Sequence, residues 1–321
     1  MRSKNIVICD SEAVYANRLA QWLLEKKEMN FQIHIMHDSH LAEKFSKEQG
    51  IHILIVDDGI EKEIRERLAP DHMIFLYRYS ASEEKGKNVR QIFKYQSADS
   101  IFKEILDICM QDEDPSCFRP VKKGNRQIVA VYSPINRIGK TTFAWEMARV
   151  CAKRGKTLYF STDAYTVLEV QPEEEGFSVS DLLYFAGQES CRIGIKVSAA
   201  APNDGRMQYL NPPVSREDVC QAGGKEWYQI ALRILDEGAY EYVIVEPEGI
   251  CQELFWFLDK CGKVFAPFTA DSDLKIKRFL RDLQRTGYAN LGERICWIDM
   301  GKDWRREILE TFERGGEDGE T

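Results

Sequence analysis

Short apolar runs alternate with segments of helical periodicity along most of the chain. In the first third, strand-like runs occupy residues 5–9, 31–36, 51–56, 73–77 and 91–93. The last helical segment of this region repeats apolar residues at helical spacing, namely Ile101, Ile105, Ile108 and Cys109. Strands that alternate with helices are typical of parallel α/β sheets. We therefore predict that this region forms a flavodoxin-like, doubly wound sheet.

A second region with the same alternation begins near Ile128. Residues 111–127 show neither the helical nor the strand period and are rich in polar residues, so we interpret them as a linker. We expect domains at 1–110 and 128–314, and a flexible acidic tail at 315–321. The predicted fold class is α/β, with two doubly wound parallel-sheet domains, the first receiver-like and the second built around a phosphate-binding loop.

The second region opens with a strand, a turn and a helical pattern that suit phosphate binding. The apolar run 127–133 leads into Pro134, and the tetrapeptide GKTT at 139–142 opens the helix. This is the context that a GxxxxGK[ST] loop requires, except that Pro134 replaces the first glycine. In such a loop, backbone N–H groups point at anionic oxygens, Lys140 contacts the β- and γ-phosphates, and the Thr141 hydroxyl joins the Mg²⁺ shell. We therefore predict ATP and Mg²⁺ as cofactors; the alternative is a chance match at the start of a helix.

The loop resembles the deviant phosphate loop of the ParA/MinD ATPases. The resemblance implies that the nucleotide contacts Asn136, Arg137, Ile138, Gly139, Lys140, Thr141 and Thr142. The segment 155–165 resembles the second strand of this family and retains Asp163 from its DxD pattern. The segment 240–249 resembles the Walker B strand, with Glu246 in place of the usual aspartate. The resemblance thus implies catalytic roles for Lys140 and Asp163, and Mg²⁺ binding by Thr141 and Glu246.

Departures from the ParA/MinD pattern predict ATP binding with slow or absent hydrolysis. Ile135 stands where the family has its signature lysine, and it offers no charge to a phosphate. Arg137 is a candidate substitute, because a guanidinium group suits phosphate geometry. The alternative interpretation of Asp163 is a residue that caps a turn at a strand end, and that of Glu246 is an ordinary carboxylate beside Pro247. The sequence leaves open whether the protein is an enzyme.

A ParA/MinD-like unit preceded by a receiver-like domain is the arrangement of the TadZ/CpaE pilus-assembly proteins. The receiver positions are occupied here by Asp10 with Ser11, Asp57, Tyr77 or Arg78, and Lys94. Asp57 is the candidate phospho-acceptor. However, aspartyl phosphorylation needs Mg²⁺ held by several acids, and Ser11 removes one of them. We therefore expect an atypical receiver-like domain that serves as a docking or dimer surface.

The TadZ/CpaE resemblance implies an ATP-gated homodimeric scaffold that localises and helps assemble a Flp/Tad-type pilus or related secretion machinery. Its partners would be the assembly components, and its location the cytoplasm, in this family often at a cell pole. One alternative is a cycling ParA-type partition ATPase that binds nonspecific DNA; another is a phosphorylation-driven signalling protein. A net charge of −8 argues against a dedicated nucleic-acid binder. The basic helical segment 274–285 is interpreted as a solvated face.

Composition narrows the remaining possibilities. No apolar run approaches the roughly 20 residues of a membrane-spanning helix, and the first residues lack the apolar core of a signal peptide. We therefore expect a cytoplasmic protein without a direct membrane anchor. The nine cysteines include no CxxC pair and are interpreted as reduced core thiols. All five histidines lie in the first region, and we expect them at the surface or in turns, without a metal.

Overall fold

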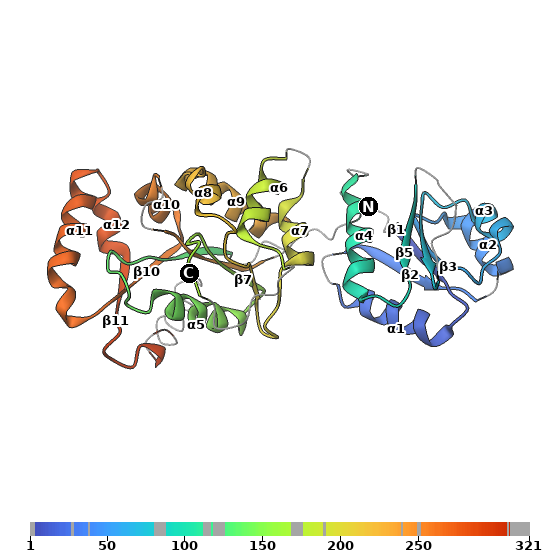
Figure 1. Cartoon of the computed structure of the whole chain (residues 1–321), viewed down its shortest axis with the longest axis horizontal. Helices are drawn as coiled ribbons and strands as arrows, with labels where there is room; N and C mark the ends of the chain where they lie inside the picture. Colours follow the sequence, from blue (N-terminus) through green and yellow to red (C-terminus); the bar gives the residue numbers. More distant parts are fainter. Residues whose placement is uncertain are drawn as a thin grey trace, which may run out of the picture. The chain divides into compact units, whose positions relative to one another are not determined.

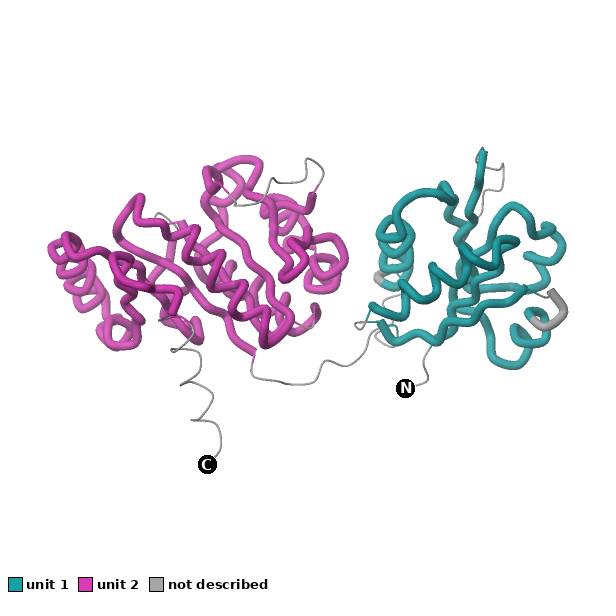
Figure 2. The backbone as a smooth tube through the Cα atoms, turned by 90° about the horizontal axis from the view of Figure 1, so that it is seen from below, with its two compact units in different colours: residues 1–121 teal, residues 122–321 magenta. Residues whose placement is uncertain are grey.

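The computed structural model describes residues 4–26, 29–37, 39–79, 88–111, 117, 126–167, 176–188, 191–238, 240–248, 252–306 and 308. Most of the predicted linker and all of the predicted acidic tail lie outside these residues. The chain divides into two compact units, residues 1–121 and 122–321 (Figure 2).

The first unit contains a parallel sheet of five strands in the order β2-β1-β3-β4-β5. The strands are β1 (Lys4–Cys9), β2 (Phe31–Ile35), β3 (Ile53–Asp57), β4 (His72–Tyr77) and β5 (Val89–Phe93). The helices are α1 (Ala13–Leu24), α2 (Ser39–Gln49), α3 (Lys62–Leu68) and α4 (Ala98–Gln111). This is the flavodoxin-like strand order. The predicted doubly wound sheet is confirmed, and each of its strands coincides with one of the apolar runs.

Burial on both faces explains why the inner strands, such as β3, read as continuous apolar runs. All residues of β3 are buried, because helices cover both sides of a parallel sheet. On one face, Val7 and Leu54 pack in a cluster with Ala42 of α2 and Leu68 of α3. The predicted apolar stripe of α4 is also buried: Ile101, Ile105, Ile108 and Cys109.

The second unit contains a six-stranded sheet in the order β11-β10-β6-β9-β7-β8, with all paired strands parallel. The strands are β6 (Gln127–Val131), β7 (Thr157–Ser161), β8 (Gln208–Tyr209), β9 (Tyr242–Glu246), β10 (Lys263–Phe268) and β11 (Ile295–Asp299). The helices are α5 (Lys140–Ala152), α6 (Val179–Ala186), α7 (Ile193–Ala200), α8 (Arg216–Cys220), α9 (Gly224–Glu237), α10 (Leu254–Lys260), α11 (Asp273–Arg285) and α12 (Ala289–Arg294). The predicted fold class, two parallel-sheet α/β domains, is therefore confirmed.

Helices cover the two faces of the second sheet unequally. Helix α5 lies on one face, and α8, α9 and α10 lie on the other (Figure 1). On the α5 face, Phe143 packs in one cluster with Val129 and Ile244. On the opposite face, Trp227 of α9 packs with Leu158. Since strand side chains alternate between faces, this arrangement fixes which residues of β6, β7 and β9 lie beside α5. The carboxyl ends of these strands meet at one edge of the sheet, where ligands of doubly wound folds bind.

Candidate functional site

The loop that joins β6 to α5 is stabilised by hydrogen bonds and contains two residues with positive φ. The Ser133 hydroxyl donates to the Pro267 carbonyl of β10 at 2.8 Å and accepts from the Ile135 N–H at 3.1 Å. Arg137 and Gly139 have φ values of 57° and 80°. Glycine adopts such a conformation without steric cost, and Gly139 forms the N-cap of α5. The loop thereby presents the first N–H groups of a helix, which have no partner within the helix and favour anions.

Three predicted site residues meet just beyond this loop. Glu246, at the end of β9, accepts a hydrogen bond at its Oε1 from the Thr141 hydroxyl at 2.9 Å. The same oxygen lies 3.6 Å from the Lys140 ammonium group. Glu246 is only 1% exposed, and a buried carboxylate needs polar partners such as these. The structure thus places a carboxylate, a hydroxyl and an ammonium group together at the N-terminus of α5.

Tyr159 also contacts Glu246, a role that was not predicted from the sequence. Its hydroxyl, at the centre of β7, donates to Glu246 Oε2 at 2.8 Å. Burial, followed by the charge of Glu246, raises the pKa of Tyr159 well above its ordinary value. The phenol therefore remains a hydrogen-bond donor at physiological pH. A buried tyrosine in mid-strand requires an acceptor, and that requirement was the one available signal.

Other loop residues are placed differently. Asn136 and Arg137 are exposed, whereas Ile138 and Thr142 are half-buried. Within the described residues, the Arg137 guanidinium group forms no hydrogen bond or ion pair. Arg137 is therefore available to an external anion.

Asp163 lies in the turn that follows β7, and its contacts are those of a turn former. Its carboxylate accepts a hydrogen bond from the Tyr165 N–H at 2.9 Å, and its own N–H donates to the Ser161 hydroxyl at 3.2 Å. This is the alternative interpretation that the sequence left open. The structure brings Asp163 to the same edge of the sheet as Glu246, because Ser161 and Glu246 are paired in the register of β7 and β9.

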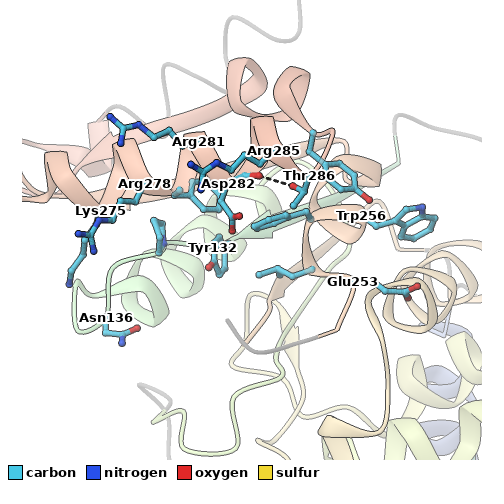
Figure 3. Close-up of a pocket in the computed structure, with 15 residues that line it drawn as sticks. Tyr132, Asn136, Glu253, Trp256, Lys275, Arg278, Arg281, Asp282, Arg285 and Thr286 are labelled. Carbon is cyan, nitrogen blue, oxygen red and sulfur yellow. Dashed lines mark hydrogen bonds between the residues drawn. The ribbon is translucent and has the colours of Figure 1, made fainter.

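A cavity of about 1110 Å³ lies beside the first half of the loop. Tyr132, Pro134 and Asn136 line one side, and α10 and α11 contribute the other (Figure 3). Four basic residues of α11 line it: Lys275, Arg278, Arg281 and Arg285. Two acidic residues, Glu253 and Asp282, also lie in the lining, so the cavity carries an excess of positive charge.

The first unit contains a second cluster of charged side chains, at the predicted receiver positions. The Asp57 carboxylate accepts hydrogen bonds from the Ser11 hydroxyl at 2.5 Å and from the Arg78 guanidinium at 2.9 Å. The Lys94 ammonium lies 2.7 Å from Asp10 and 3.3 Å from Asp57. Of the two residues considered for the Thr/Ser position, Arg78 is the one that reaches Asp57.

Burial and charge act in opposite directions on this cluster. Burial raises the pKa of Asp57, but hydrogen bonds from Ser11 and the charge of Lys94 outweigh it, and the net pKa is lowered. For Asp10, burial outweighs the hydrogen bond from Lys94, and the pKa is raised. The Asp57 side chain is fully buried and already neutralised by two cations. The Asp57 carboxylate is thus already engaged by Ser11, Arg78 and Lys94.

Comparison with known proteins finds a similarity for the first unit. A model of the TadZ-like receiver domain matches residues 1–110. Among curated proteins, no sequence relative matches the chain.

Several solved structures are similar at low sequence identity. A ParA family ATPase from Chlorobium tepidum TLS is 12% identical, with 58% of this chain and 81% of that chain covered and a TM-score of 0.42. A cobyrinic acid a,c-diamide synthase from Mycobacterium smegmatis, with bound ADP and magnesium, is 17% identical over 59% of this chain and 81% of that chain, with a TM-score of 0.40. The MinC:MinD cell division protein complex of Aquifex aeolicus gives 18% identity over 54% of this chain and 68% of that chain, with a TM-score of 0.38.

The receiver match agrees with the strand order of the first unit and with the cluster of charged side chains at its predicted receiver positions. Residues 1–110 are therefore similar to a TadZ-like receiver domain, which confirms the predicted TadZ/CpaE-type resemblance for this unit.

Among the described residues, no helix is both long and apolar enough to cross a membrane.

Proposed function

We propose that the chain is an ATP-binding, ATP-gated dimeric scaffold that localises and helps assemble a Flp/Tad-type pilus or related secretion machinery. The main support for nucleotide binding is that Lys140, Thr141 and Glu246 lie together at the N-terminus of α5. The TadZ-like receiver domain supports the assignment to a pilus system. The proposed location is the cytoplasm, at a cell pole.

The residues around Glu246 fit a Mg²⁺ ion. Magnesium prefers hard oxygen ligands, and the Thr141 hydroxyl and the Glu246 carboxylate lie 2.9 Å apart. These two groups would hold the ion, which would neutralise phosphate charge. Lys140 would leave Glu246 and contact the phosphates, and the amides of residues 136–142 would surround them. The contacts of Thr141 and Lys140 with one buried carboxylate therefore support this cofactor pair.

Slow or absent hydrolysis is part of the proposal. Ile135 provides no charge where the ParA/MinD family has its signature lysine. The Asp163 carboxylate is engaged by the Tyr165 N–H, so positioning a water would require it to leave its turn. Arg137 remains the candidate cation for the partner's nucleotide, since it is exposed and free of polar contacts within the described residues.

Isothermal calorimetry with Mg-ATP tests nucleotide binding. We expect Lys140→Ala to weaken binding at least about tenfold, or ~1.4 kcal/mol, because the ammonium contact with the phosphates is lost. Lys153→Ala is the matched control, since Lys153 is an exposed lysine at the other end of α5 and should leave affinity unchanged. Absence of binding heat in folded wild-type protein would refute the proposal.

The cavity beside the loop favours a second candidate function, a partition-type ATPase that binds nonspecific DNA. Basic residues of α11 line that cavity, and clustered Arg and Lys bind DNA phosphates in a salt-dependent way. Under this candidate, the protein binds DNA only with ATP, the affinity falls steeply with salt, and Arg281→Ala with Arg285→Ala weakens binding whereas Lys153→Ala does not. Failure to bind DNA at low salt with ATP would exclude it.

A further inference from the structure

Three buried side chains of the first unit converge outside the sites described above. One ring nitrogen of His52 and the Sγ atoms of Cys109 and Cys117 all lie within 4.8 Å of one another. The three residues are 5%, 1% and 0% exposed. His52 is therefore not the surface or turn histidine expected from the sequence. It directly precedes β3, whereas Cys109 lies in the last turn of α4 and Cys117 follows that helix.

The spacing of these atoms suits a tetrahedral metal ion. Zinc binds cysteine sulfur at about 2.3 Å and histidine nitrogen at about 2.0–2.1 Å, so two such ligands at the tetrahedral angle lie about 3.6 Å apart. His52 Nε2 and Cys117 Sγ are 3.7 Å apart. A hydrogen bond from a thiol to an imidazole has a similar length, so this distance alone does not distinguish a metal site from a hydrogen bond. The other contacts of the cluster must do so.

The surroundings of His52 resemble those of a metal ligand. Its other ring nitrogen, Nδ1, lies 3.1 Å from Asp71 Oδ2. Metal-binding histidines generally donate their second N–H to a carboxylate in this way, which fixes the tautomer and aims the free nitrogen at the metal. The Lys4 ammonium also lies 3.3 Å from both ring nitrogens.

We infer that His52, Cys109 and Cys117 form a binding site for zinc or another thiophilic divalent cation, with water as the fourth ligand. The site would fasten the chain that leaves α4 to the start of β3. The backbone already makes one such link, because the Asn30 N–H donates to the Cys117 carbonyl at 2.8 Å.

Metal content of the full-length protein tests this inference. Chelator-treated protein is dialysed under reducing conditions against zinc, and bound zinc is measured by mass spectrometry. We expect about one ion per chain, and cobalt in its place should give the thiolate charge-transfer and visible bands of a tetrahedral site. Cys117→Ser and His52→Asn should each abolish stoichiometric binding and both cobalt bands. Zinc should also raise the thermal midpoint of the wild type and shield Cys109 and Cys117 from alkylation.

Cys9→Ser is the matched control, because it removes a buried thiol of the same unit outside the cluster. It should retain zinc, and circular dichroism of each apo variant checks that it is folded. Zinc content that is substoichiometric in the wild type, or equal in Cys117→Ser and wild type, would overturn the inference. A Cys109–Cys117 disulfide in protein isolated under reducing conditions would overturn it too.

Discussion

Lys94 is the cation that three carboxylates of the receiver-like domain share. Its side chain is fully buried and its ammonium lies within 3.3 Å of Asp10, Glu12 and Asp57. Lys94→Met would keep the volume but leave two buried carboxylates without their shared cation. Since removing one partner of a buried ion pair typically costs about 3–5 kcal/mol, we expect a loss of that size in the free energy of unfolding. Urea denaturation followed by circular dichroism measures it.

Lys44→Met provides the control for that substitution. Lys44 is 73% exposed and, among the residues that the structure describes, pairs only with Glu48 at 3.9 Å, one helical turn away. Exposed pairs of this kind contribute little, so the unfolding transition should not move measurably. Equal effects of the two substitutions would show that the buried charge network is not what stabilises the unit.

Asp57 carries the prediction about phosphorylation. Its carboxylate is fully buried and bound by Ser11, Arg78 and Lys94, and Ser11 occupies the place of a Mg²⁺-binding acid. We expect that incubation with acetyl phosphate and Mg²⁺ leaves the intact mass unchanged, in wild type and Asp57→Asn alike. A phosphoryl adduct on wild type that Asp57→Asn lacks would contradict this prediction and favour the signalling alternative.

At the scale of elements, the contact between α7 and α9 leaves no room for a side chain at Gly194. A Cβ atom there would lie 2.6 Å from the Gly238 nitrogen and 2.7 Å from the Arg233 carbonyl oxygen. These are backbone atoms, so the helices would have to separate. We expect Gly194→Ala to lower the free energy of unfolding by about 1–3 kcal/mol, as overpacking of a close contact does.

Gly187→Ala tests whether space, and not glycine itself, decides the effect at Gly194. Gly187 follows α6, and its nearest neighbouring atom would lie 3.7 Å from an added Cβ. Its φ of −71° suits alanine. Thermal unfolding of both variants should therefore separate them, with Gly187→Ala close to wild type.

The strands that the sequence predicted most directly are the inner ones. β1, β3 and β6 lie where apolar runs placed them, because residues buried on both faces of a sheet are apolar in succession. β2 and β5 overlap predicted runs although they are only partly buried, and β7 and β9 lie within the segments that the family resemblance indicated. β8 (Gln208–Tyr209) is too short to show a period, and its position is set by pairing with β7.

The candidate sites were predictable only where their residues are close in sequence or fall at strand ends. Lys140 and Thr141 belong to one motif, and Glu246 ends an apolar strand. Tyr159 was missed because its contact with Glu246 depends on which strands become neighbours. The His52, Cys109 and Cys117 cluster was missed for the same reason, since its members are far apart in the chain and match no spacing motif.

For the whole molecule, the question is what nucleotide binding would change. A ligand that binds only the dimer stabilises it by mass action, and the size of the effect is set by the difference in affinity between the two states. A triphosphate at the N-terminus of α5 would draw Lys140 away from Glu246, and the exposed Arg137 beside it is free to contact a second subunit. Nucleotide and partner would then be bound at adjoining surfaces of the second unit.

Mass in solution, measured by light scattering after size exclusion, tests this coupling. Since the monomer mass is 37.1 kDa, we expect that value without nucleotide and twice that value with Mg-ATP. Lys140→Ala should remain monomeric under both conditions because it cannot hold the phosphates, and Lys153→Ala should behave as wild type. Arg137→Ala should bind ATP but dimerise less, if its guanidinium group contacts the partner's nucleotide. A dimer that forms equally with and without nucleotide would refute gating by ATP while leaving a constitutive scaffold, and unchanged dimerisation of Arg137→Ala would remove that residue from the interface.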